Sequence, residues 1–295
     1  MLRGYSSNKV IGVLRGGLGN QLFQLVGYLA IARSNRKALA LDVGTFSHPS
    51  QVSLGRKLEI EGFADALGFT LLPTSSFQAV ERLRSSCVWA VRSILDLTPL
   101  DRFGPLLMSE KKGLGNLPEA RVQGLRMVDG YFADVWGKPL FRDTLEEVID
   151  HLNQARGCLP AGILEKYSGF DLTVHMRLGD MVAANEGLLG DLDRALSEVA
   201  NERGARILVF SDEPQRAERI LQSHGLSEFE FAPMTWSSLE TLLVMSLANR
   251  LYCSPSTFSW WAGVLANSRG GVVYYPKLKV KGSELMTIPD SWVRF

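Results

Sequence analysis

The sequence predicts an α/β protein whose sheets are mostly parallel, divided into two domains. Short apolar strands alternate with segments of helical periodicity along the chain. Tight turns join several strands directly to helices, and β-α-β crossovers of this kind are short and right-handed, which makes the strands parallel. The 295 residues are enough for two domains that each bury a core.

The first half begins as strand, Gly-rich turn and helix. KVIGVL (9–14) reads as a strand, and apolar residues within 20–35 recur at i, i+3, i+4, i+7 and i+8, which predicts a helix. KALALD (37–42) is a second strand, and GLRMVDGYF (124–132) contains another. Residues 46–125 are rich in Gly, Pro and Ser and show no motif. A helix over 141–155 ends at RGCLPAG, which places the boundary between domains 1–160 and 161–295.

The second half alternates more regularly. Strands are expected at 170–176, 205–211, 250–253 and 270–276, and helices at 191–204, 213–225, 237–249 and 258–268. Gly225 should stop the second of these helices. This pattern predicts a Rossmann-like domain over 160–275, with a related domain before it.

Composition excludes several function classes. Lys plus Arg (32) nearly equals Asp plus Glu (31), so no nucleic acid partner is indicated. Cys87, Cys158 and Cys253 lie far apart and suggest buried thiols in a reducing compartment rather than disulfides or a zinc site. No apolar run is long enough to span a membrane. Residues 82–97 could form a basic amphipathic helix that lies on a membrane or, alternatively, a helix that faces the core.

Four chemically unusual segments follow predicted strands: RGGLGN (15–20), HMRLGD (175–180), SDEPQ (211–215) and SPSTFSWW (254–261). The glycines of the first segment supply either the dihedrals of a tight turn or a bare backbone that can approach a phosphate. In a parallel sheet, the carboxyl ends of the strands share one edge, where ligands bind. The segments therefore predict a ligand site at that edge.

His175 and Arg177 lie two residues apart on a strand, so their side chains should leave on the same face. A guanidinium there must meet an anion or a set of carbonyls, and a phosphate or an internal carboxylate would suit Arg177 equally. His175 could also be a satisfied core histidine. Asp180 is expected to hold the turn that follows.

The remaining polar residues of these segments each have two interpretations. Ser254, Ser256 or Thr257 should cap a helix whose N-terminus could also hold a diphosphate, while Trp260 and Trp261 pack that helix on the sheet. Asp212 is the N-cap of the next helix, a ligand for the N–H donors of a purine, or both. DLD (191–193) is similar to a metal-binding Asp-x-Asp but should cap a helix N-terminus, and no other metal-ligand spacing occurs.

Taken together, GGLGNQLFQ, GYF, HMRLGD, FSD and SPSTFSWWAGVLA resemble glycosyltransferase family eleven, the α-1,2-fucosyltransferases of the GDP-fucose-dependent superfamily. The resemblance spans 12–274, and H-x-R-x-G-D followed by S-x-F-S-W-W is its specific part. It implies a GT-B-like architecture of two facing Rossmann-like domains, with the acceptor bound mainly by the first and the donor by the second. It also implies inverting, metal-independent transfer of fucose from GDP-β-L-fucose to a galactose 2-hydroxyl, without a cofactor.

The resemblance also implies roles for single residues. Arg177 would hold the diphosphate, and His175 and Asp212 would contact guanine. The further donor-binding residues would be Gly16, Gly17 and Asn20 from the first domain and Ser256, Thr257 and Phe258 from the second. Glu186 is the leading candidate for the general base, followed by Asp180 and Asp129.

This chain departs from the family pattern in places. The family often has H-x-R-R-G-D-Y, whereas Leu178 and Met181 stand at the later positions here. GYFAD lacks the common Gln after Phe132, and Pro255 replaces a small polar residue. The motifs therefore specify the donor more closely than the acceptor.

The expected partners are GDP-fucose and a galactose-containing glycan, in the synthesis of a surface polysaccharide or oligosaccharide. The expected location is the cytoplasm, with the amphipathic segment 82–97 allowing peripheral contact at the cytoplasmic face of the inner membrane. The sequence indicates no oligomeric state. Two alternatives stay open: a GT-B glycosyltransferase with another linkage or donor sugar, and a regulator that binds a nucleotide without turnover.

Overall fold

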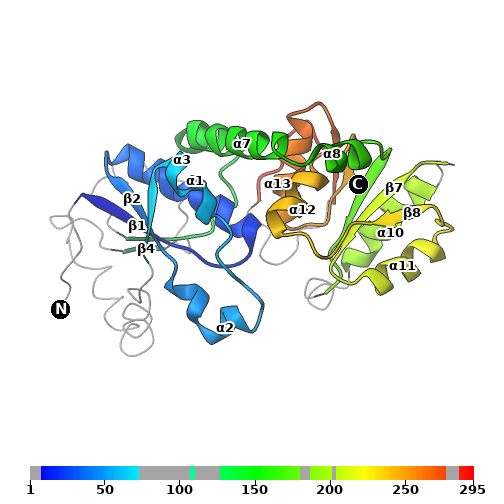
Figure 1. The fold of residues 1–295 in the computed structure, drawn as a ribbon, viewed down its shortest axis with the longest axis horizontal. Helices are drawn as coiled ribbons and strands as arrows, with labels where there is room; N and C mark the ends of the chain where they lie inside the picture. The colour runs from blue at the N-terminus through cyan, green and yellow to red at the C-terminus, as the bar shows by residue number, and fades with distance from the viewer. Residues whose placement is uncertain (1–7, 73–106, 110–126, 180–186, 201–203, 277–285) are drawn as a thin grey trace. The chain divides into compact units, whose positions relative to one another are not determined.

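A computed structural model describes residues 8–72, 107–109, 127–179, 187–200, 204–276 and 286–295 (Figure 1). The chain divides into two compact units, Met1–Val148 and Ile149–Phe295. The division falls inside helix α7 (Arg142–Gly157), upstream of the predicted boundary after residue 160. The segment 82–97, predicted to face a membrane or the core, lies outside the described residues.

Among the described residues, the first unit holds a parallel sheet with the strand order β3-β2-β1-β5-β4. Its strands are β1 (Lys9–Val13), β2 (Ala38–Asp42), β3 (Phe69–Leu72), β4 (Leu107–Ser109) and β5 (Met127–Asp129). Its helices are α1 (Leu18–Ser34), η1 (Gly44–Ser47), α2 (Pro49–Val52), η2 (Glu61–Phe63), α3 (Ala64–Leu67) and η6 (Pro139–Phe141), before α7.

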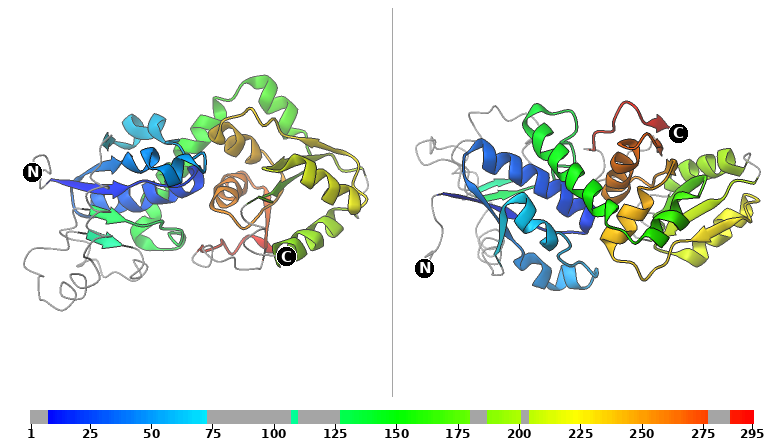
Figure 2. Two further views of the ribbon diagram at one scale, coloured as in Figure 1. Left: turned by 90° about the horizontal axis from the view of Figure 1, so that it is seen from below. Right: turned by 45° about the horizontal axis from the view of Figure 1, so that its top comes forward.

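Helix α1 lies lengthwise against strands β1 and β2 and is buried along nearly its whole length (Figure 2). Two glycines make this close packing possible. A Cβ on Gly12 would lie 2.3 Å from the ring of Tyr28, and a Cβ on Gly27 would lie 2.2 Å from the ring of Phe132. Phe132, in the GYF motif, is buried and has a left-handed backbone with φ 53°. The glycines and the GYF motif therefore have a packing role in this unit.

The second unit holds a parallel sheet of order β11-β10-β9-β6-β7-β8 among its described residues. Its strands are β6 (Leu172–Met176), β7 (Ile207–Ser211), β8 (Phe229–Phe231), β9 (Arg250–Tyr252), β10 (Val272–Tyr275) and β11 (Val293–Arg294). Its helices are α8 (Ala161–Ser168), α10 (Gly187–Ala200), α11 (Pro214–Ser223), α12 (Ser238–Met245) and α13 (Thr257–Asn267). The predicted alternation of strand and helix is confirmed.

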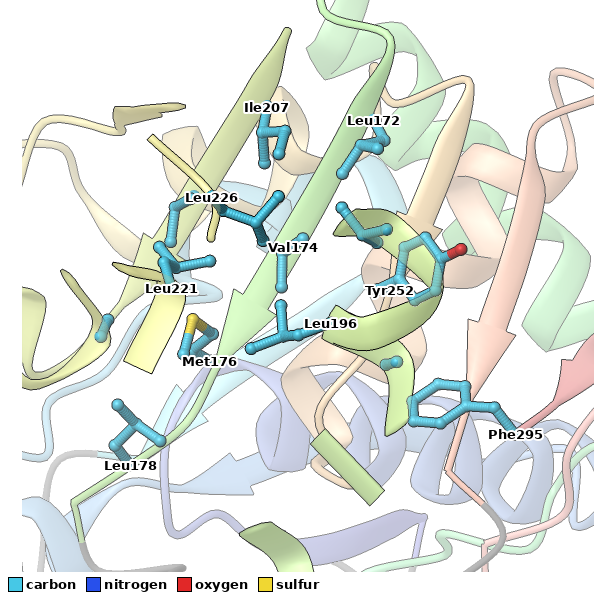
Figure 3. Packing of buried hydrophobic residues seen from close by; sticks show 14 residues of the cluster. Leu172, Val174, Met176, Leu178, Leu196, Ile207, Leu221, Leu226, Tyr252 and Phe295 are labelled. Carbon is cyan, nitrogen blue, oxygen red and sulfur yellow. The ribbon is translucent and has the colours of Figure 1, made fainter. Parts of the chain in front are cut away.

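The central strand β6 separates a wholly apolar face from a more polar one. Leu172, Val174 and Met176 point along one face into a buried cluster with residues of α10 and α11, such as Leu196 and Leu221 (Figure 3). Because side chains alternate along a strand, Thr173 and His175 belong to the opposite face. His175 therefore lies on the face of the sheet opposite to the cluster that packs on α10 and α11.

Single residues of the second unit agree with two of the expectations and contradict a third. Gly225 has φ 76° and follows the C-cap of α11, so the predicted stop is confirmed. Trp260 and Trp261 are fully buried, as expected. DLD does not open a helix: α10 already begins at Gly187, so Asp191 and Asp193 lie beyond its first residues and the capping prediction is wrong.

The cysteines differ from one another. Cys253 is buried, and desolvation raises the pKa of its thiol. Cys158 is exposed, so the prediction of a buried thiol is wrong there, since it lies past the end of α7 rather than on an apolar face. Cys87 lies outside the described residues. None of the described helices combines the length and apolar character that a membrane crossing requires.

Candidate functional site

Three of the four predicted segments meet at one edge of the second unit's sheet. Strand β6 lies between β9 and β7, although the chain forms β7 and β8 before it returns to β9. The strand order therefore reverses at β6, and such a switch point is where open parallel sheets bind ligands. HMRLGD begins in the last two residues of β6, SDEPQ begins at the last residue of β7, and SPST follows β9. The predicted convergence of these segments is confirmed.

Ser254 connects the loops that follow β9 and β6. Its hydroxyl donates to the carbonyl oxygen of His175 at 2.7 Å and accepts from the backbone N–H of Arg177 at 2.9 Å. Because Ser254 is buried, these bonds are shielded from water and fix the backbone on both sides of Met176. Ser254 was a candidate cap in the sequence, but its role in the structure is to hold this loop.

Asp212 is bound to the same loop from the side of β7. Its carboxylate accepts from the backbone N–H groups of Leu178 (2.8 Å) and Gly179 (3.3 Å), and it forms an ion pair with Nε of Arg177 at 3.1 Å. A Cβ on Gly179 would lie 3.0 Å from the carboxylate, which explains a glycine there. The N-cap of α11 is Glu213, without a side-chain cap bond. The prediction that Asp212 caps this helix is therefore wrong, because its carboxylate turns toward β6 instead.

Of the two anions that would suit Arg177, an internal carboxylate is thus present in the structure. The pair is not buried, since the side chains of Arg177 and Asp212 are 31% and 26% exposed. A guanidinium has five N–H donors, and the contact through Nε uses one of them. The pair orients the planar group at the rim of the sheet.

Sequence reasoning missed two further residues that hold this loop. Ser211 donates from its hydroxyl to the carbonyl of Met176 at 2.9 Å, and Arg216 donates to the carbonyl of Leu178 at 3.1 Å. The position of Ser211 directly before Asp212 was a usable signal. Arg216 gave none, because an arginine on an exposed helix surface is common.

His175 lies on β6 with only 8% of its surface exposed. Its Nδ1 is hydrogen-bonded to Oγ of Ser259, and its ring centroid lies 6.0 Å from that of Phe258. Burial lowers the pKa of His175 to about 4, helped by the positive charge of Arg177 and opposed by Asp212. The ring is therefore neutral at pH 7. Since Nδ1 has a buried hydrogen-bond partner, the interpretation of His175 as a satisfied core histidine is correct for this nitrogen.

Helix α13 begins at this edge. Of the three candidate caps, Ser256 is the N-cap, and its hydroxyl accepts from the backbone N–H of Ser259 at 3.1 Å. Thr257 and Phe258 follow in the first turn and are partly exposed. The first turn of a helix carries unsatisfied N–H groups and the positive end of the helix dipole, so this end favours an anion.

In the first unit, the loop RGGLGN follows β1 at the switch point of that sheet, since β2 and β5 flank β1. Gly16 has φ 80°, and its missing side chain leaves room for Asn20, whose Nδ2 would lie 2.6 Å from a Cβ. The turn interpretation is therefore correct for Gly16. Gly17 is the N-cap of α1, and a Cβ there would lie 2.9 Å from Nη1 of Arg56.

The two glutamines Gln21 and Gln24 of GGLGNQLFQ form hydrogen bonds with backbone groups. Gln21 donates to the carbonyls of Gly16 (2.9 Å) and Lys57 (2.8 Å) and accepts from the N–H of Glu59. Gln24 accepts from the N–H of Arg15 at 3.0 Å. Both glutamines are fully buried, and Gln21 connects the Gly-rich loop to the backbone of Lys57 and Glu59.

The candidates for the general base divide into two groups. Asp180 and Glu186 lie outside the described residues. Asp129, at the end of β5, forms an ion pair with Arg15, and the guanidinium of Arg15 lies 5.8 Å from the ring centroid of Tyr131. Asp129 therefore already accepts a charged donor. Within the described part of the chain, no group of His, Cys, Asp and Glu has the arrangement of a metal site.

No protein-family model matches the chain, and no curated protein matches it. The fold is similar to solved structures. An arginine-to-lysine variant of Arabidopsis thaliana FUT1 in complex with GDP has a TM-score of 0.50 and 14% identity, over 96% of this chain and 72% of that one. Escherichia coli heptosyltransferase WaaC with ADP has a TM-score of 0.45 and 12% identity, over 97% and 92%. Bradyrhizobium fucosyltransferase NodZ has a TM-score of 0.45 and 14% identity, over 88% and 92%.

The likeness to FUT1 extends over nearly the whole chain, and the two parallel sheets agree with it. The chain therefore has the GT-B-like fold of glycosyltransferases, as the sequence predicted.

Proposed function

We propose that this chain is a metal-independent, inverting α-1,2-fucosyltransferase, which transfers L-fucose from GDP-β-L-fucose to the 2-hydroxyl of a β-galactoside. One observation carries the proposal: loops from β6, β7 and β9 meet at the switch point of the second sheet, with the Arg177 guanidinium at its rim. The motifs in these loops are those that resemble family eleven. The fold is that of a glycosyltransferase, which supports the reaction class.

Arg177 is proposed to stabilise the departing diphosphate. The ion pair with Asp212 uses Nε, so the guanidinium is held in one plane before any ligand arrives. Preorganised donors of this kind are typically worth about 3 kcal/mol to the transition state. The first turn of α13, with Ser256, Thr257 and Phe258, would supply backbone N–H groups and the helix dipole to the same phosphates.

His175 and Asp212 were expected to contact guanine. Asp212 already accepts from Arg177 and two backbone N–H groups, so we propose that its main role is to position Arg177. We propose that Nε2 of His175 contacts the guanine base.

The first unit would contribute the Gly-rich loop and the acceptor site. Gly16, Gly17 and Asn20 stand at the N-terminus of α1, where Arg56 adds a positive charge beside Gly17. An anion is favoured at such a helix end. Glu186 remains the proposed general base, with Asp180 next, since Asp129 is paired with Arg15. The proposed compartment is the cytoplasm, and the acceptor is a galactose-containing glycan.

The direct test is incubation of the purified chain with labelled GDP-fucose and a panel of β-galactosides, followed by linkage analysis of the product. An α-1,2-linked fucose is expected without added metal and in the presence of a chelator. Transfer of another sugar, or another linkage, would replace the specific proposal by a different GT-B transferase. Binding of GDP without hydrolysis or transfer would favour a nucleotide-binding regulator.

The variants Arg177→Ala and Arg177→Lys test the site itself. Both should lower kcat by about a hundredfold, because about 3 kcal/mol of transition-state stabilisation is lost and an ammonium cannot replace the planar fork. Arg206→Ala is the matched control, since Arg206 stands before β7 at the opposite edge of the sheet and contacts Phe170 and Gly169. Near-normal turnover of Arg177→Ala would refute the role. Separately, Glu186→Gln should lower kcat and abolish the acidic limb of the pH profile, where protonation of the base lowers kcat, and full kcat at every pH would remove Glu186 as the base.

A further inference from the structure

Three side chains form a continuous hydrogen-bonded chain from the N-cap of α13 to His175. The hydroxyl of Ser256 accepts from the backbone N–H of Ser259 at 3.1 Å and lies 3.1 Å from the hydroxyl of Ser259. The hydroxyl of Ser259 is in turn bonded to Nδ1 of His175. Ser259 and His175 are both buried, so water does not compete for these bonds.

The bond between the two serine hydroxyls sets the direction of the protons, because Ser256 donates to the hydroxyl of Ser259. In this arrangement the single hydroxyl proton of Ser259 is directed at Nδ1 of His175, which accepts it. A neutral imidazole has one N–H, and if Nδ1 accepts, that N–H is on Nε2. The surroundings favour the neutral ring, because burial and the cation Arg177 both lower the pKa of His175 and outweigh the opposing effect of Asp212.

Nε2 is the ring nitrogen that can reach a ligand. In the described part of the chain, four side-chain polar atoms are fully buried and lack a hydrogen-bond partner. Nε2 of His175 is not one of these atoms, which agrees with an atom that reaches the surface. His175 also lies only two residues before Arg177, which directly follows β6 and whose side chain is partly exposed.

We propose that Ser259 is a positioning residue that fixes the neutral His175 ring in its Nε2–H form, so that the site presents a hydrogen-bond donor to the base of the bound nucleotide. The inference rests on the proposed function, because it requires a nucleotide at this edge. The inference adds to the proposed function that the site prefers one nucleotide base over another. Guanine presents acceptors at N7 and O6, whereas adenine replaces the O6 acceptor by an N6 donor. N7 is an acceptor in both bases, so a fixed donor that faces the O6 or N6 position favours guanine.

The form of the ring can be measured without any ligand. The chain has four histidines, so a ring ¹⁵N spectrum of the full chain labelled at histidine is simple, and His175→Asn assigns the signal. At pH 7 we expect an unprotonated Nδ1 and a protonated Nε2. A protonated Nδ1 in the wild-type chain would overturn the inference while leaving the proposed function intact.

Ser259→Ala removes the donor to Nδ1. The ring should then populate both neutral forms, and Kd for GDP should rise about tenfold, the value of about one hydrogen bond, while Kd for ADP changes little. Ser268→Ala is the matched control on the same helix, since its hydroxyl bonds only the carbonyl of Leu265 near the C-terminus. A purely structural role for Ser259 would weaken GDP and ADP alike without a change of ring form, and that result would overturn the inference.

If Ser259→Ala does not fold, Ser256→Gly provides the second test. Glycine is acceptable at an N-cap, so α13 should persist, but the proton that orients Ser259 is lost. A mixture of ring forms is expected, and an unchanged spectrum together with an unchanged Kd for GDP would count against the hydroxyl chain. Failure of the wild-type chain to bind GDP would instead refute the proposed function.

Discussion

Replacing His175 by Asn should remove a specific pH dependence of stability. The pKa of His175 falls from 6.5 to about 4 in the folded protein, first because of burial and then because of Arg177. At 1.36 kcal/mol per pKa unit, this difference corresponds to about 3 kcal/mol. The unfolded chain binds a proton near pH 6.5 and the folded chain does not, so the stabilisation is complete above pH 6.5 and is lost as pH falls toward 4.

The assay is urea denaturation of the wild-type chain and His175→Asn at several values between pH 7.5 and 4. Between pH 6.5 and 4, the free energy of unfolding of the wild type should fall more steeply with decreasing pH, by about 1.4 kcal/mol per pH unit. The two curves should approach each other by about 3 kcal/mol over the range. Other titrating groups are common to both chains and cancel in the comparison.

His48→Asn is the control, because His48 is exposed and caps the short helix α2, where asparagine is also a good cap. A change of slope confined to His175→Asn would assign the effect to the buried ring. Parallel curves for the wild type and His175→Asn would show that the folded protein does not exclude a proton from this ring. That outcome would also remove the neutral histidine on which the inferred role of Ser259 depends.

Two other predictions concern substitutions, one pair in the first unit and one pair in the second. Gly27→Ala should lower the free energy of unfolding by about 1–3 kcal/mol, since its Cβ would meet the ring of Phe132, whereas Gly62→Ala has no atom within 4 Å and should have little effect in the same denaturation assay. Asp212→Asn should lower kcat of the proposed transferase about tenfold, because the charged partner of Arg177 is lost, while Asp193→Asn, more than half exposed, should not; equal kcat values for both would contradict the positioning role.

The sequence predicted most of the fold because each long element has one clear period. Apart from Thr173, strand β6 is apolar up to His175, and α1 has apolar residues at helical spacing. The errors fall where the local signal is weak. The start of α10 was placed too late because GLLG contains two glycines, which weaken a helix prediction. Strand β4 spans only Leu107–Ser109, which is too short for a periodic pattern.

For the site, the sequence could name residues but not their partners. Arg177, His175, Asp212 and Ser256 were found because each lies at or just after the end of a predicted strand. Which carboxylate meets Arg177 depends on β7 lying beside β6, and the order of strands in a sheet is a property of the whole fold. The same holds for Ser254, because only the return of the chain to β9 brings its hydroxyl to β6.

The switch point explains why this loop can be rigid before a ligand binds. Because β6 is flanked by β7 on one side and β9 on the other, the backbone after it receives bonds from both: Asp212 holds Leu178 and Gly179, and Ser254 holds Arg177. A loop that follows the outermost strand of a sheet would have a neighbouring strand on one side only. The conformational entropy of ordering Arg177 is therefore lost largely during folding, so a diphosphate that binds here would not have to order it.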